Sequence, residues 1–186
     1  QVREIISGWP DGVYRGESII DDDGFEHKMI PIRATITIQA DTMIVDLSES
    51  SRQVTGFINS AYANTRSIVH AAMMYLAPSD LPKNEGSMRP VTVVAPRGLI
   101  VNASPPAPVC MSTNHCAEEI VEAVFRALAP AVPHAVSAAS GRRLRYAITG
   151  TDPRTGRQYI WHFFMGRPGG GASHGADGWS NVGEIN

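Results

Sequence analysis

The clearest hydrophobic pattern in the chain is an alternation of apolar and polar positions between residues 30 and 38. Its apolar members are Ile30, Ile32, Ala34, Ile36 and Ile38. A period of two places them on one face of a β-strand and leaves the other face to polar residues. Shorter apolar runs at 12–20 and 43–47 flank it, separated by turns rich in Asp and Gly. The first third therefore predicts a three-stranded antiparallel meander with one solvated face.

A helical period near 3.6 follows between residues 60 and 76. Its apolar positions are Tyr62, Val69, Ala72, Met73 and Leu76. Pro78 lies just beyond them and cannot continue a helix, because proline lacks a backbone donor. Asn59 or Ser60 is suited to cap the start, since both side chains accept hydrogen bonds from free N–H groups.

The same period returns between residues 114 and 128. Its apolar positions are Ile120, Val121, Val124, Phe125 and Leu128. Ser112 or Thr113 is a suitable N-cap, and Pro130 ends the pattern. Glu118 and Glu119 stand near the first turn, where the helix dipole favours anions. These features predict the second main helix.

The remaining segments predict short strands and loops. Residues 84–109 join a polar elbow, two apolar runs at 91–95 and 99–101 and a proline-rich exit, and the nearly all-apolar runs suit buried strands. Segments 145–149 and 158–165 predict a hairpin around a Pro- and Gly-containing turn, and 166–178 is a glycine-rich loop. The fold class that we predict is α+β, an antiparallel meander and mixed short strands packed with two main helices.

Length and charge narrow the classes of protein. A chain of 186 residues is expected to form a single domain over 1–186, and a net charge of −2 without a basic stripe argues against nucleic acid as a partner. No apolar run reaches the roughly 18 residues of a membrane span. The chain has no initiator Met and no signal-peptide pattern, so we expect a cytoplasmic piece of a longer chain. Cys110 and Cys116 lack a CxxC spacing and are expected to be reduced thiols.

Motifs for phosphate, cation or metal binding are weak. A phosphate loop needs Lys and Ser or Thr after its last glycine, but Gly175 is followed by Ala176 and Asp177. The acidic run at 21–23 lacks the spaced ligands of a calcium loop, so a solvated turn is favoured over a cation site. The six histidines form no pair at ligand spacing on a predicted element, so no metal site is predicted within the chain.

Candidates for acid–base or nucleophilic chemistry are few. His115 follows Asn114 at the predicted helix start, where a helix N-terminus tends to keep an imidazole neutral and able to exchange protons. A capping histidine in solvent is the alternative. Ser104 lies outside any nucleophile elbow, and Cys110 or Cys116 would not face His115 from a helix start.

Six pieces in order carry a family resemblance. They are Gly12-Val13-Tyr14 leading to Asp21-Asp22-Asp23-Gly24, Val45-Asp46-Leu47-Ser48, Gly56-Phe57-Ile58-Asn59, the segment 84–109, the helix 114–128 and the Gly169-Gly170-Gly171 to Asp177-Gly178 tail. The series resembles the hydantoinase B-type subunits, a family that includes 5-oxoprolinase, N-methylhydantoinase and the large subunits of acetone and acetophenone carboxylases. These subunits are several times longer, so the chain is expected to be an internal or C-terminal-half fragment.

The resemblance implies part of an ATP-dependent enzyme that opens a cyclic amide such as a hydantoin or 5-oxoproline. An A-type partner subunit would bind ATP and Mg²⁺ and phosphorylate the amide or carboxylate oxygen, in a hetero-oligomer. The resemblance implies no cofactor on this segment and leaves a divalent metal to an N-terminal region of the longer subunit. A ketone carboxylase subunit and a non-catalytic assembly domain stay open as alternatives, and the isolated fragment is expected to be inactive.

On the resemblance, five polar residues are expected to line the pocket, because they lie on predicted turns and a helix start, where function concentrates. The catalytic candidates are Glu85, His115 and Asp177, and the substrate-binding candidates are Asn84 and Asn114.

Overall fold

A computed structural model describes residues 1–141, 146–163 and 169–180. The chain divides into two compact units, residues 1–137 and 138–186, and each is described by itself. The single domain expected over 1–186 stays a prediction. The first unit holds a four-stranded sheet and the main helices, and the second holds a hairpin and a loop, which together make the α+β class that the sequence predicts.

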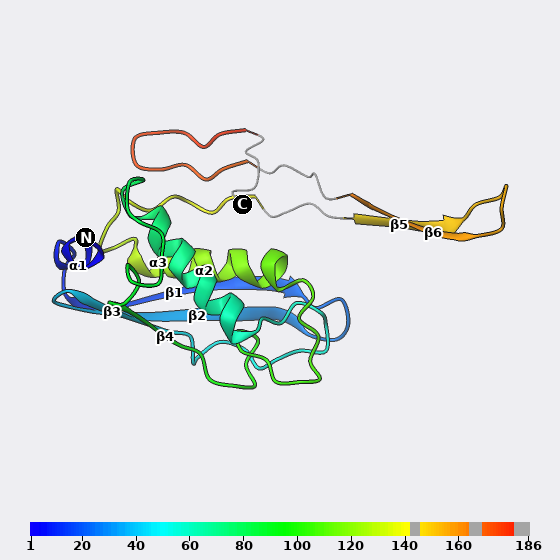
Figure 1. Ribbon diagram of the computed structural model, residues 1–186, viewed down its shortest axis with the longest axis horizontal. Helices are drawn as coiled ribbons and strands as arrows, with labels where there is room; N and C mark the ends of the chain where they lie inside the picture. The colour runs from blue at the N-terminus through cyan, green and yellow to red at the C-terminus, as the bar shows by residue number, and fades with distance from the viewer. Residues whose placement is uncertain (142–145, 164–168, 181–186) are drawn as a thin grey trace. The chain divides into compact units, whose positions relative to one another are not determined.

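The sheet of the first unit has the strand order β1-β2-β3-β4 (Figure 1). Strands β1 (Gly12–Asp22), β2 (Lys28–Gln39) and β3 (Thr42–Asp46) run antiparallel in sequence order, which confirms the predicted meander. Strand β4 (Val91–Val94) adds to β3 in parallel.

Strand β2 follows its alternation residue by residue. All five apolar positions predicted for the inner face, from Ile30 to Ile38, are buried, and Arg33 on the other face is exposed. The inner face forms one core with apolar side chains of the helices, such as Val69 and Ile120. The period of two therefore decides which face of the sheet receives the helices.

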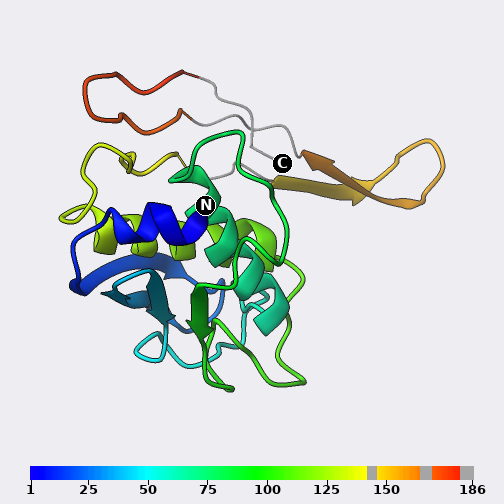
Figure 2. The same ribbon diagram turned by 60° about the vertical axis from the view of Figure 1, so that its left-hand side comes forward.

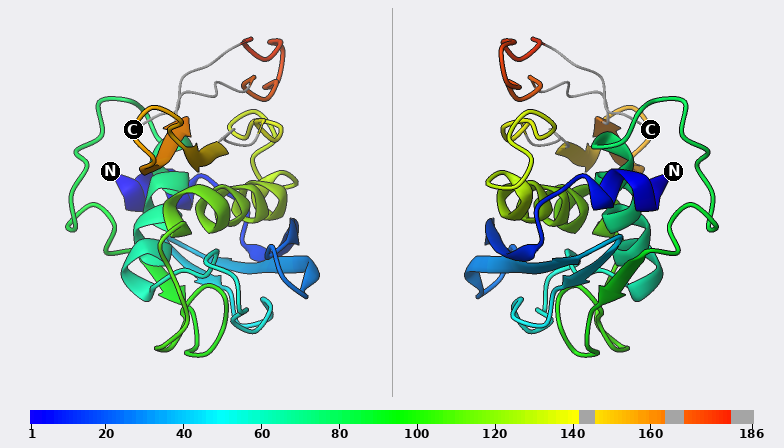
Figure 3. Two further views of the ribbon diagram at one scale, coloured as in Figure 1. Left: turned by 90° about the vertical axis from the view of Figure 1, so that its right-hand side faces the viewer. Right: turned by 90° about the vertical axis from the view of Figure 1, so that its left-hand side faces the viewer.

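Three α-helices accompany this sheet, and α2 and α3 cover its inner face (Figure 3). They are α1 (Val2–Ser7), α2 (Tyr62–Tyr75) and α3 (Ala117–Leu128). Neither predicted N-cap is correct, because Ala61 and Cys116 precede α2 and α3 and neither caps its helix with a side chain. None of the described helices combines the length and the apolar character needed to cross a membrane.

The backbone of α3 lies directly against β1 at Gly16. A β-carbon at that position would stand 2.2 Å from the carbonyl oxygen of Ala123 and 2.4 Å from the nitrogen of Ala127. No side chain fits at these distances, so Gly16 sets how closely the helix approaches the sheet.

The strand expected at 99–101 is wrong. These residues form a turn in which Leu99 makes isolated bridges to Arg52 and Asn102. Ile100 and Val101 are nevertheless fully buried. A short apolar run specifies burial but does not distinguish a buried strand from a buried turn.

The second unit contains the predicted hairpin, formed by β5 (Tyr146–Thr151) and β6 (Gln158–Phe163) (Figure 2). The predicted hairpin residues Arg145, Phe164 and Met165 lie outside the described part of the chain. The described part of the glycine-rich loop pairs with its own unit, since Ala138 donates to the carbonyl of Ala172 at 2.7 Å. No helix follows within residues 169–180, which agrees with the argument against a phosphate loop.

Candidate functional site

Two long loops of the first unit meet at the start of α2, and the side chain of Asn59 joins them. Asn59 is completely buried. Its Nδ2 donates to the carbonyls of Val54 and Gly56, both at 2.9 Å, and of Pro108 at 3.0 Å, while its Oδ1 accepts from the N–H of Val54 at 2.8 Å. Every polar atom of this buried amide is therefore used, as burial requires.

A second buried network lies one step further along the chain. The Thr65 hydroxyl donates to the carbonyl of Val101 at 2.5 Å and lies 2.9 Å from the Ser60 hydroxyl. The N–H of Ser60 donates to Ile100, and the carbonyl of Ser60 accepts from Ala103. The turn 99–103 is thereby fixed against the first turn of α2.

A π-helical turn, η1 (Ser112–Cys116), carries two of the predicted site residues. The N–H of Ala117 donates to the carbonyl of Ser112, five residues back, instead of four as in an α-helix. Asn114 is 5% exposed and its Nδ2 lies 3.7 Å from the sulfur of Met111, whereas His115 is half-buried. Of this pair, His115 is the more accessible to a substrate.

Glu85 and Asn84 lie on an exposed loop on another side of α2. Glu85 forms an ion pair with Arg66, and Asn84 accepts a hydrogen bond from the N–H of Ser87 at 3.1 Å. The hydrogen bond from Arg66, with that residue's positive charge, lowers the pKa of the Glu85 carboxyl. Glu85 is therefore a weaker base than an ordinary glutamate.

The structure does not gather the predicted residues into one constellation. Arg66, which holds Glu85, and Asn64, which contacts Ser112, are two residues apart on α2 and do not face each other. Asp177 is exposed in the loop of the second unit. The substrate and catalytic roles of all five residues stay predictions.

His70, one helical turn after Arg66, was not singled out by the sequence. Its Nε2 is buried and has no hydrogen-bond partner within the part of the chain that the structure describes. Burial lowers the pKa of His70, the charge of Arg66 lowers it further, and the charge of Glu85 opposes both. The residue is thus kept neutral near pH 7.

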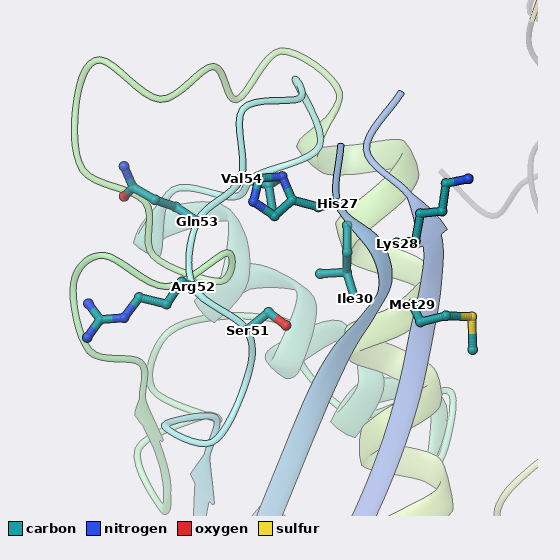
Figure 4. A pocket seen from close by; sticks show the side chains of 8 residues that line it. All are labelled: His27, Lys28, Met29, Ile30, Ser51, Arg52, Gln53 and Val54. Carbon is teal, nitrogen blue, oxygen red and sulfur yellow. The ribbon is translucent and has the colours of Figure 1, made fainter. Parts of the chain in front are cut away.

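A pocket of about 270 Å³ opens between the end of the β1–β2 hairpin and the segment 51–54 (Figure 4). Lys28 and Met29 point away from it on one side, and Arg52 and Gln53 point away on the other. Its charged side chains do not converge, so the pocket lacks the clustered polar groups of a binding site.

Beside this pocket, the predicted solvated turn at 21–24 is wrong for Asp23, which is buried. Burial alone would raise its pKa, but hydrogen bonds from the N–H of Phe25, the ring of His27, and the N–H groups of Gly56 and His27 lower it to about 2. Asp21 and Asp22 are exposed, as expected. No group of three potential metal ligands occurs among the described residues.

Neither cysteine supports nucleophilic chemistry with His115. Both are free thiols, as the sequence predicts. Cys116 is completely buried, and burial raises the pKa of its thiol far above the ordinary range. Cys110 is exposed on the loop before the π-turn. A buried thiol that stays protonated is inert.

The fold and the loops at the start of α2 define a class of protein, an α+β segment of a larger enzyme subunit. The whole chain, residues 1–186, matches the model of the Hydantoinase B/oxoprolinase family, and the protein belongs to that family.

Relatives of known name agree with this assignment. The chain is 35% identical over 187 residues to the beta subunit of the caprolactamase of Pseudomonas jessenii, covering 99% of this chain and 32% of that protein. It is 30% identical over 196 residues to the B subunit of a putative D-/L-hydantoinase of Pseudomonas sp. (strain NS671), covering 97% and 32%. The chain therefore spans about a third of the length of these relatives.

Two solved structures share the fold. The crystal structure of the ATP-dependent caprolactamase from Pseudomonas jessenii matches with a TM-score of 0.83 at 35% identity, over 98% of this chain and 32% of that chain. A nucleotide-free acetone carboxylase structure matches with a TM-score of 0.76 at 18% identity, over 100% and 28%. At 18% identity the second likeness concerns the fold alone.

Sequence reasoning missed Asn59, Asn64 and Arg66 as organisers of the site. Asn59 stands inside one of the six family pieces, Gly56 to Asn59, and that was the available signal. Its hydrogen-bond partner Pro108 lies 49 residues away, so the contact itself is not visible in the local pattern.

Proposed function

We propose that the chain is part of the B-type subunit of an ATP-dependent enzyme that hydrolyses a cyclic amide. The observation that carries this proposal is the combined likeness to the ATP-dependent caprolactamase, 35% identity with a TM-score of 0.83 over nearly the whole chain. The likeness to the putative hydantoinase at 30% identity supports the same class of substrate, a ring closed by an amide.

In this proposal an A-type partner holds ATP and Mg²⁺ and phosphorylates an oxygen of the substrate. Phosphorylation removes the resonance that protects an amide and creates a good leaving group. The B-type subunit then supplies the pocket in which water attacks. A divalent metal, where one is required, belongs to a part of the protein outside this chain, and the assembly works in the cytoplasm.

Within the chain, we propose that the π-turn contributes to the pocket. His115 is half-buried there and has an imidazole that suits proton transfer near neutral pH. Glu85 and Asn84 are the second choice, because Glu85 is committed to Arg66. Asp177 and Asn114 complete the set of candidate residues.

The test uses the full-length gene product, expressed with the A-type subunit encoded beside it. Caprolactam, hydantoin and 5-oxoproline are each supplied with ATP, and the ring-opened product is measured by chromatography. We expect ATP-dependent opening of at least one ring, no activity from residues 1–186 alone, and reduced kcat for His115→Ala. Glu26→Ala, at an exposed position of the β1–β2 turn, is the control.

Two outcomes would redirect the proposal. Turnover that requires bicarbonate and a ketone would assign the chain to a carboxylase instead. Full activity after single replacement of Glu85, His115 and Asp177 by Ala would leave the chain as an assembly domain, with the chemistry elsewhere.

A further inference from the structure

The loop 103–112, which leads into the π-turn, stands out from the first unit and is fastened at both ends (Figure 3). At its start, the N–H of Ser104 donates to Oε1 of Gln53 at 2.8 Å, and Nε2 of Gln53 donates back to the carbonyl of Ser104 at 3.3 Å. At its end, the N–H of Met111 donates to the carbonyl of Phe57 at 3.1 Å. Both fastenings belong to the segment 53–57.

Asn59 provides the fastening between these ends. Through Pro108 it ties the middle of the loop to the same segment, whose own shape it fixes through Val54 and Gly56. A buried amide with four hydrogen bonds cannot change its orientation without leaving polar groups unpaired. The path of the chain toward the π-turn is therefore determined by one side chain.

Asn64 acts on the π-turn itself. The carbonyl of Ser112 accepts the π-type hydrogen bond from Ala117, and it also accepts Nδ2 of Asn64 at 3.4 Å. The same Nδ2 donates to the Ser60 hydroxyl at 2.9 Å, so Asn64 is anchored within α2. Single π-turns are rare and frequently stand at functional sites, and they persist where their surroundings hold them.

We propose that Asn59 and Asn64 are positioning residues of the enzyme, which hold the π-turn so that His115 lies in a fixed place in the pocket. This inference rests on the proposed function of the preceding subsection. Neither asparagine touches substrate. Each acts through the π-turn, Asn59 by fixing the approach of the chain and Asn64 by holding Ser112.

Hydrogen exchange of the full-length protein tests the structural half of the inference. Asn59→Ala and Asn64→Ala are compared with Ser50→Ala, a control that removes two buried hydrogen bonds to the backbone of Arg33, away from the loop. We expect the amides of residues 111–116 to exchange about tenfold faster in both asparagine variants and to be unchanged in the control. Equal exchange in all three variants would overturn the inference. Asn64 is half-exposed, so its variant should fold even if Asn59→Ala does not.

Steady-state kinetics of the assembled enzyme test the functional half. We expect kcat to fall about tenfold to a hundredfold in each asparagine variant with KM nearly unchanged, because misplacement of a reacting group lowers kcat. In a His115→Ala background, the same replacements should cause no further loss. A full additional loss there, or unchanged kcat in the single variants, would overturn the inference. If the wild type lacks ATP-dependent turnover, the proposed function fails, and the exchange experiment still decides whether the asparagines hold the turn.

Discussion

The carboxylate of Asp23 accepts a hydrogen bond from the backbone N–H of Gly56 at 3.2 Å, and no side chain fits at Gly56. A β-carbon there would lie 2.1 Å from the carbonyl oxygen of Asp23. The contact joins the end of the β1–β2 hairpin to the segment that also carries Asn59. It therefore links the sheet to the loops that lead to the π-turn.

The close approach at Gly56 predicts a large effect of a single methyl group. Gly56→Ala should destabilise the chain by about 1–3 kcal/mol, because the backbone of Asp23 must move. Urea denaturation followed by circular dichroism measures the change. Gly8→Ala is the matched control, since its β-carbon would come no closer than 3.4 Å to a neighbour. Equal stability of the two variants would contradict the described packing.

The lowered pKa of Asp23 predicts a specific loss of stability in acid. The folded pKa is about 2 and the ordinary value is 3.8, so the ionised carboxylate stabilises the fold above about pH 4. This contribution is lost as the pH falls through 2. Asp23→Asn should therefore be less stable at pH 6 and show a flatter decline between pH 4 and 2.

The control for that measurement is Asp21→Asn in the same turn, where the side chain is exposed. We expect its stability to follow the wild-type pH profile, as measured by denaturation midpoints. A wild-type slope in Asp23→Asn would show that the buried carboxylate does not stabilise the fold.

His70 predicts opposite responses to two neighbouring charges. Arg66 lowers the pKa of His70 and Glu85 raises it, in addition to the lowering by burial. Nuclear magnetic resonance titration of the imidazole should therefore give a higher pKa in Arg66→Gln and a lower pKa in Glu85→Gln than in the wild type. Shifts of the same sign in both variants would contradict the arrangement of these three residues.

The two thiols predict selective chemical labelling. Cys110 is exposed, whereas Cys116 is buried and burial raises its pKa, so only Cys110 should react with iodoacetamide at pH 8. Mass spectrometry of native protein should show one label, and labelling in urea should show two. A native label on Cys116 would mean that α3 opens at its start.

How much of the fold the sequence can predict depends on the range of the interaction. The alternation in β2 and the helical period in α3 predict both elements because every residue repeats the same choice between core and solvent. The helix caps and the strand at 99–101 failed, because each depends on what a few residues meet. Asp23 looks like part of a solvated turn until Gly56, 33 residues away, supplies its hydrogen bond.

The candidate site divides in the same way. A helix start at 114 was a local inference, and the structure replaces it with a π-turn held by Asn64 and, through the loop before it, Asn59. Glu85 was chosen for its place on a polar elbow, but its partner Arg66 belongs to a different predicted element. Pairings between elements are set by tertiary packing, which a single sequence does not display.

The central claim, that this chain serves ATP-dependent ring opening, is tested most directly by measuring ADP and ring-opened product together. The full-length protein and its A-type partner are mixed with a cyclic amide, with and without ATP. We predict that product forms only with ATP and both subunits, and that product and ADP rise in a constant ratio. Ring opening without ATP, or ATP consumption that yields no ring-opened product with any of the tested cyclic amides, would contradict the account.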